Sequence, residues 1–194
     1  MRVPRGRPRN LQRRETILEA AERLFGSRAF LGAKMREIAT AAGIGETLLY
    51  RYFPSKAALA DALARRATTA VQVFVADALQ RFGTGPFTIE RLNDFGRRYS
   101  LFLHETYHLR CCWHAMPERF ASQDAEIADA SEALQRLADS MFARLAINHD
   151  ETRSRTLAYL HAIEGYATRR TRLPISSDPS LERYVSDTTE VFTH

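Results

Sequence analysis

The apolar positions of this chain recur with the spacing of α-helices rather than with the alternation of β-strands. In the segment 15–25, apolar residues stand three and four positions apart, as on the buried face of an amphipathic helix. The same spacing runs through 55–82, breaks at the GTGP sequence of 83–86, and returns near 92–107, 127–145 and 150–170. Pro179 suits the first turn of a last helix, 179–192. The pattern predicts an all-α fold of about nine helices.

The stretch 34–53 predicts two short helices joined by a tight turn. Met35, Ile38 and Ala39 give the first of them an apolar face, and Gly43 suits the left-handed turn that ends it. The second helix is expected at about 45–51, only two turns long. This arrangement is typical of a helix-turn-helix, whose second helix enters the major groove of DNA.

Three blocks resemble, in order and distance, the N-terminal domain of the TetR family of bacterial transcriptional regulators. They are ILEAAERLF at 17–25, MREIATAAGI at 35–44 and LLYRYFPSKAAL at 48–59. The resemblance covers about the first third of the chain. It implies a basic flexible arm at 1–10, a helix-turn-helix DNA-binding domain at 11–59, and a helical ligand-binding and dimerisation domain at 60–194.

Some positions depart from the family pattern. Ala33 replaces the threonine that usually caps the second helix, which predicts the loss of a cap worth ~1 kcal/mol. Glu46 and Leu48 replace the small or basic residues usual in the recognition helix. The fold is not affected by these changes, but no operator sequence can be carried over from the family.

Charge is concentrated at the amino-terminal end. Residues 1–60 carry 12 basic and 5 acidic side chains, a net charge of +7, whereas the remainder carries 16 basic and 18 acidic ones. A basic patch confined to one module is typical of polyanion binding. The sequence Arg5-Gly6-Arg7-Pro8 resembles the core of an AT-hook, which lies in the minor groove of A·T-rich DNA. A leader without fixed contacts explains this short motif equally well, and Pro4 and Pro8 disfavour helix in either case.

The side chains expected to contact DNA divide into base-reading and phosphate-binding groups. Thr47 can hydrogen-bond a base edge or a phosphate, and Leu48 can contact a thymine methyl group. Glu46 either favours the helix dipole or accepts a hydrogen bond from cytosine. By the family resemblance, Tyr50, Tyr52 and Lys56 contact phosphates. The complete predicted set is Arg5, Arg7, Lys34, Arg36, Gly45, Glu46, Thr47, Leu48, Tyr50, Arg51, Tyr52 and Lys56.

The second domain is rich in aromatic side chains, which line a small-molecule pocket or simply fill a core. The candidate ligand-binding residues are Phe95, Tyr99, Phe102, Tyr107, Trp113, Met116, Phe120, Met141, Phe142 and Tyr166. The expected effector is a small apolar or aromatic molecule, and no cofactor is expected. A regulator controlled by a protein, a metal ion or redox state is the alternative, because His104, His108, Cys111 and His114 share helical spacing and Cys111 adjoins Cys112.

By the family resemblance, the last two helices form a four-helix bundle with a second subunit. The residues expected at that interface are Tyr159, Ala162, Ile163, Tyr166, Arg169, Tyr184 and Val191. Packing inside one subunit would produce the same apolar spacing. A homodimer would engage a pseudo-palindromic operator with two copies of the short recognition helix.

Other classes of protein are disfavoured by the sequence. The chain has no strong catalytic or metal-binding motif, so an enzyme is not expected. Apolar runs are shorter than the ~20 residues that span a bilayer, and the basic start has no apolar segment after it. The two adjacent cysteines do not suggest a disulfide scaffold, so the expected setting is the cytoplasm.

Overall fold

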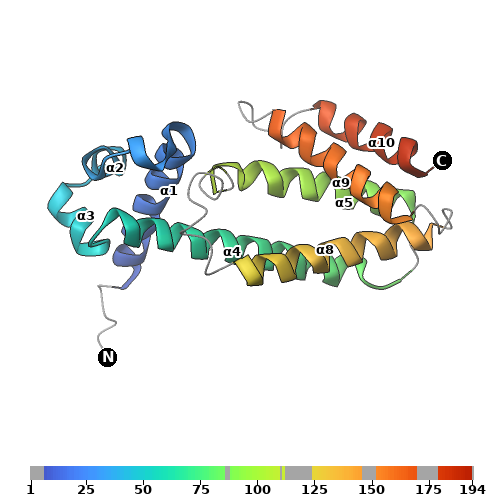
Figure 1. Cartoon of the computed structure of the whole chain (residues 1–194), viewed down its shortest axis with the longest axis horizontal. Helices are drawn as coiled ribbons and strands as arrows, with labels where there is room; N and C mark the ends of the chain where they lie inside the picture. The colour runs from blue at the N-terminus through green and yellow to red at the C-terminus, as the bar shows by residue number, and fades with distance from the viewer. Residues whose placement is uncertain are drawn as a thin grey trace. The chain divides into compact units, whose positions relative to one another are not determined.

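The computed structural model of the chain describes residues 7–85, 88–109, 111, 124–145, 152–169 and 179–193 (Figure 1). Within these ranges the regular structure is helical and contains no strand, which confirms the predicted all-α class. The chain divides into two compact units, one of residues 1–68 and 108–124 and one of residues 69–107 and 125–194. The division between these units falls within one long helix, after Thr68.

The first unit contains α1 (Arg7–Gly32), α2 (Met35–Ala41), α3 (Glu46–Tyr52) and the first part of α4 (Lys56–Phe82). Its core is built from the apolar faces that the helical spacing predicts. Ile17 and Phe25 of α1, Ile38 of α2, Leu49 of α3 and Leu63 of α4 are all buried in it. These contacts hold two very short helices, which are too short to be stable alone.

The start of α1 differs from the prediction of a flexible arm at 1–10. The helix begins at Arg7, so Pro8 lies in its first turn. Proline is tolerated there because the first N–H groups of a helix have no acceptor within it. The expectation of a non-helical backbone is therefore wrong for residues 7–10.

An ion-pair cluster joins α1 to α4 inside the first unit. Arg66 Nη1 lies 2.5 Å from Glu15 Oε1, and Arg66 Nε lies 3.7 Å from Glu22 Oε2. Burial raises the pKa of the Glu22 carboxyl group, although the positive charge of Arg66 opposes the shift.

The second unit contains the later part of α4, α5 (Ile89–Glu105), α8 (Asp124–Arg144), α9 (Thr152–Arg169) and α10 (Pro179–Thr193). α8 runs beside α4 in the same direction: Gln72 donates a hydrogen bond to Glu126, and Arg144 donates one to the carbonyl of Gly83. α5 packs against both α9 and α10, which also pack against each other.

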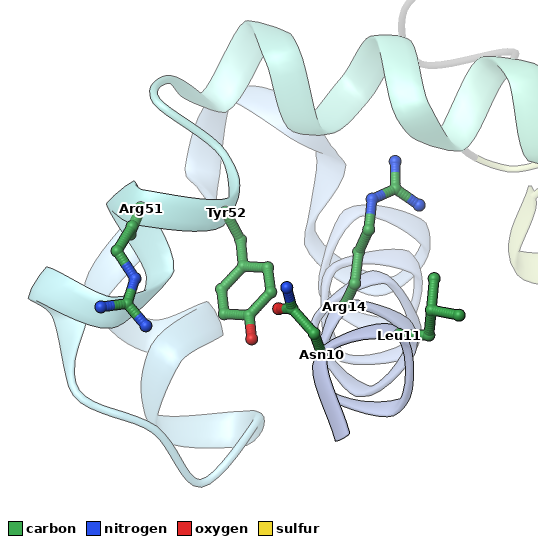
Figure 2. A pocket seen from close by; sticks show the side chains of 5 residues that line it. All are labelled: Asn10, Leu11, Arg14, Arg51 and Tyr52. Carbon is green, nitrogen blue, oxygen red and sulfur yellow. The ribbon is translucent and has the colours of Figure 1, made fainter. Parts of the chain in front are cut away.

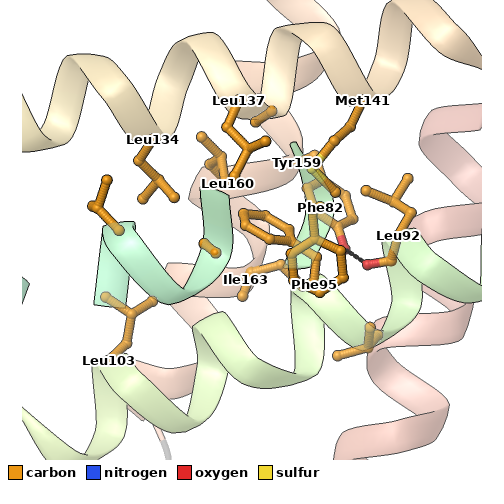
Figure 3. Close-up of a cluster of buried hydrophobic side chains, with 14 of the residues drawn as sticks. Phe82, Leu92, Phe95, Leu103, Leu134, Leu137, Met141, Tyr159, Leu160 and Ile163 are labelled. Carbon is orange, nitrogen blue, oxygen red and sulfur yellow. Dashed lines mark hydrogen bonds between the residues drawn. The ribbon is translucent and has the colours of Figure 1, made fainter. Parts of the chain in front are cut away.

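Large apolar side chains from all five helices meet in one core (Figure 3). Phe95 of α5 packs edge to face against Phe82 of α4, with ring centroids 5.6 Å apart. Tyr159 of α9 meets Phe142 of α8 in the same way at 5.4 Å. Such pairs add to the stabilisation from apolar burial. No helix in the described ranges has the length and apolar character needed to cross a membrane.

Candidate nucleic-acid interface

The turn between α2 and α3 has the geometry of a helix-turn-helix. Gly43 adopts a positive φ of 65°, which L-residues with a side chain rarely adopt. The Ile44 N–H then donates to the Ala39 carbonyl at 3.0 Å, and Gly45 becomes the N-cap of α3. The prediction that Gly43 supplies a left-handed turn is confirmed.

The start of α2 is capped although position 33 does not carry the threonine that is usual in the family. Lys34 is the N-cap residue, and its backbone N–H donates to Glu37 Oε2 at 3.0 Å. This hydrogen bond is one half of a capping box. Glu37 therefore supplies a cap at the start of α2, where the sequence analysis predicted a lost one because of Ala33. The Lys34 and Arg36 side chains remain exposed beside this turn.

The two faces of α3 differ in burial. Leu49 is fully buried, and Phe53, the C-cap residue, is buried with it. Glu46, Thr47, Tyr50 and Arg51 are exposed, whereas Leu48 and Tyr52 are half-buried. Tyr50 is 44% exposed, which favours a surface role over core packing for this aromatic side chain. A polar and aromatic face is thereby available to an external partner.

Lys56, at the start of α4, lies against the same unit. Its Nζ is 5.9 Å from the centroid of the Phe25 ring, within reach of a cation–π contact. Partial burial lowers the pKa of Lys56, and the negative charge of Glu37 opposes this shift.

A groove of about 550 Å³ opens between the first turns of α1 and the end of α3 (Figure 2). Asn10, Leu11 and Arg14 of α1 line one side, and Arg51 and Tyr52 of α3 line the other. Sequence reasoning identified Arg51 and Tyr52 but missed the α1 residues. Asn10 and Arg14 are polar in the sequence, but the sequence does not show that they lie close to a helix almost forty residues later. Arg5 lies outside the described residues, and of Arg7 only the backbone, in α1, is described.

The candidate ligand-binding residues are distributed between a core and a groove. Phe95, Met141, Phe142 and Tyr166 are buried in the apolar core of the second unit. Tyr99 and Tyr107 are half-buried, and Trp113, Met116 and Phe120 lie outside the described residues. The core residues contact one another, as the alternative interpretation of the aromatic pattern expects.

Phe102 has a different environment, because it lines an open groove of about 440 Å³ between α4 and α5. Its ring stacks on Phe74 at a centroid distance of 4.3 Å, with an interplanar angle of 15°. Val73, which is 64% exposed, and Leu101 extend the apolar lining. Asp77, Arg98 and Glu105 also line this groove, so charged groups accompany its apolar surface.

The predicted outward stripe on α9 is wrong for three of its residues. Tyr159, Ile163 and Tyr166 are buried in the core of their own unit, and cannot meet a partner from there. Helical spacing identifies an apolar face but not the surface that covers it. Here α5, α8 and α10 cover it within the subunit.

The remaining residues of that predicted interface are only partly accessible. Ala162 is half-buried, and its carbonyl accepts a hydrogen bond from the Tyr184 hydroxyl at 3.0 Å. Tyr184 also stacks on Tyr166 at 4.2 Å. Val191 is 71% exposed, whereas the side chain of Arg169 is outside the described part of the structure. Leu157, which the sequence analysis did not select, is an exposed apolar residue of α9.

The alternative of metal or redox control depends on the histidine and cysteine residues at 104, 108, 111, 112 and 114. Among the described residues, no three histidine, cysteine, aspartate or glutamate side chains gather closely enough to hold a metal ion. Cys111 is a half-buried free thiol, while Cys112 and His114 lie outside the described ranges.

Comparison with known proteins agrees with the geometry of the first unit. Residues 17–63 match the family described as "Bacterial regulatory proteins, tetR family". The chain is 30% identical over 148 residues to the HTH-type transcriptional repressor KstR of Mycobacterium tuberculosis, covering 73% of this chain and 61% of that repressor. It is 43% identical over 70 residues to a second HTH-type transcriptional regulator of that organism, covering 34% of this chain and 35% of the regulator. The matched parts are thus less than two thirds of either relative.

Solved structures agree over a greater length. The transcriptional regulator FadR of Bacillus subtilis, solved in complex with stearoyl-CoA, superposes with a TM-score of 0.62 over 92% of this chain and 97% of that one, at 13% identity. This likeness extends the shared fold beyond the helix-turn-helix. The relatives are transcriptional regulators and not enzymes, as the sequence predicts. The helix-turn-helix geometry and these matches together identify residues 17–63 as a DNA-binding domain of the TetR family of bacterial regulatory proteins.

Proposed function

We propose that this chain is a sequence-specific DNA-binding repressor that acts as a homodimer and leaves its operator when a small apolar or aromatic molecule binds. The exposed face of α3 carries the argument. Thr47, Tyr50 and Arg51 project from a two-turn helix whose opposite face is anchored by buried Leu49. A helix held in this way can enter the major groove without losing its own packing.

The proposed contacts divide by their chemistry. Glu46, Thr47 and Leu48 are assigned to base edges, because they lie in the first turn of the recognition helix. Lys34, Arg36, Gly45, Tyr50 and Lys56 are assigned to backbone phosphates, which fix the register of the protein on the duplex. The net charge of +7 over residues 1–60 supports the electrostatic part of this binding.

A mobility-shift experiment on the DNA upstream of the gene for this chain tests the proposal. Binding should weaken steeply when the salt concentration is raised from about 50 to 200 mM, because counterions released from DNA drive association. A matched duplex of scrambled sequence should bind much more weakly. Equal affinity for both duplexes, or no affinity for any genomic fragment, would contradict the proposed function.

The groove of about 440 Å³ between α4 and α5 is our candidate site for the effector. Its stacked Phe74 and Phe102 and its exposed Val73 suit an apolar body. The stearoyl-CoA complex of the FadR relative makes a long-chain acyl compound the first probe. Stearoyl-CoA and free stearate should raise the melting temperature and release DNA, whereas Val73→Glu should abolish both effects. Unchanged DNA binding with a wide panel of apolar compounds would favour a regulator without a small-molecule ligand.

A further inference from the structure

The groove between α1 and α3 places side chains of α1 beside Arg51 and Tyr52, two of the helix-turn-helix residues that the sequence suggests. We propose that it binds a phosphate group of the DNA backbone, with Arg14 as the charged ligand and Asn10 as a neutral hydrogen-bond donor. This inference rests on the proposed DNA-binding function and extends it to α1.

The position of Arg14 is tied to the end of α3. Its guanidinium carbon lies 5.2 Å from the centroid of the Phe53 ring, a cation–π geometry. Phe53 is the C-cap residue of α3 and is only 3% exposed, so it is a fixed platform. Arg14 itself is half-buried. The contact therefore holds a cation of α1 in register with the recognition helix and reduces the conformational entropy lost on binding.

The composition of the groove suits an anion. Of the described residues that line it, Arg14 and Arg51 are cationic and none carries a carboxylate. Asn10 and Tyr52 add an amide and a phenol, and Figure 2 shows the Tyr52 ring between Arg51 and Asn10. Guanidinium groups donate two parallel hydrogen bonds to phosphate oxygens. Leu11, which is 66% exposed, adds an apolar edge beside them.

The position of the Arg14 and Asn10 side chains favours a phosphate over a base edge as their partner. Arg14 and Asn10 lie on α1, not on the leading turn of α3 that would face the bases. Contacts of this kind position a protein without reading sequence. Arg14 should therefore change affinity and its salt dependence without changing which sequence is preferred.

The test uses the full-length protein and a duplex that the wild type selects from a random pool. Arg14→Gln should lower affinity about tenfold, as expected for a charged hydrogen bond. The slope of log K against log salt should fall by about 1 per subunit, with the ranking of duplex sequences unchanged. Arg14→Lys should keep the slope because it keeps the charge. Asn10→Ala should weaken binding without altering the slope.

Arg23→Gln is the matched control, because Arg23 is an exposed arginine on the same helix, nine positions later and on the opposite face. It should keep wild-type affinity and slope. If Arg14→Gln, with a wild-type melting curve, behaves like Arg23→Gln, the α1 contact is overturned while the proposed function stands. If the wild type binds no duplex, the proposed function is overturned, and this site with it.

Discussion

Tyr159 of α9 lies directly against the backbone of Gly96 on α5. Its hydroxyl donates a hydrogen bond of 3.1 Å to the carbonyl of Leu92, one turn earlier on α5 (Figure 3). A Cβ atom at Gly96 would collide with that hydroxyl oxygen and would lie 2.9 Å from Cγ1 of Val185 on α10. Burial also raises the pKa of Tyr159, which keeps the hydroxyl protonated as a donor. Three helices therefore meet at a position where a Cβ atom would force the Tyr159 and Val185 side chains to shift.

Replacing Gly96 with alanine should destabilise the second unit by about 1–3 kcal/mol, the usual cost of overpacking a close-packed core. Thermal and urea denaturation measure the loss. Tyr159→Phe removes the obstructing oxygen and should cost ~1 kcal/mol alone through its lost hydrogen bond. The double variant should be more stable than the sum of the two losses predicts, because the two residues are in contact. Simple additivity would show that the collision is relieved elsewhere.

Gly43 provides a test of the turn in the helix-turn-helix. Gly43→Ala places a side chain at a φ of 65° and should cost roughly 1–2 kcal/mol of stability. Space is not the cause, because nothing lies within 4 Å of the added Cβ. Gly43→Asn should cost less, since asparagine tolerates this region better than alanine does. Chemical denaturation distinguishes the two variants, and equal losses would argue against backbone strain.

The partly buried Glu22 predicts a pH dependence of folding stability. Burial raises its pKa above the ordinary value of 4.5, so the folded state holds a proton more tightly than the unfolded state. The resulting stabilisation is complete below pH 4.5 and is lost as the pH rises through the folded pKa. The melting temperature of the wild type, relative to that of Glu22→Gln, should therefore fall as the pH rises from 4.5.

Arg66 supplies the control for this effect, because its positive charge lowers the pKa of Glu22. When Arg66→Gln is introduced into both the wild type and the Glu22→Gln variant, the pH-dependent difference between the two proteins should widen. A difference that is constant with pH, with or without Arg66, would rule out a raised pKa at Glu22.

Substitutions in the recognition helix and at the start of α2 should change DNA binding in different ways. Thr47→Ala should reduce discrimination at one base position by about 1–3 kcal/mol while leaving the salt slope unchanged, if Thr47 reads a base edge. Lys34→Ala should weaken binding to all sequences equally and lower the slope by about 1 per subunit. Quantitative binding to a set of single-base operator variants, at several salt concentrations, separates these outcomes. A uniform loss for Thr47→Ala would assign it to a phosphate instead.

We propose that Leu157 of α9 and Val191 of α10, which are exposed and apolar, lie at the centre of the dimer interface. Leu157→Glu combined with Val191→Glu should shift the protein from dimer to monomer in sedimentation equilibrium, because two charges would be buried without partners. DNA affinity should fall in parallel. Leu79→Glu is the control, since Leu79 is 43% exposed but lies on α4. An unchanged dimer in the double variant would place the interface on another surface.

The sequence by itself determined the helical class, the turn at Gly43 and the membership of the first unit in its family. These features depend on local conformation and on periodic spacing, which neighbouring residues specify without knowledge of the fold. The helix beginning at residue 179 is a further case, because a proline at its first position favours that start.

The tertiary structure decided which surface covers each apolar face and which distant residues meet. Tyr159, Ile163 and Tyr166 have the spacing of an interface stripe, yet they face the core because α5, α8 and α10 surround them. Arg14 and Phe53 are brought together because α1 and α3 contribute to the same apolar core. Helical spacing shows only that one face of a helix is apolar. The surface that covers this face is determined by packing between helices far apart in the chain.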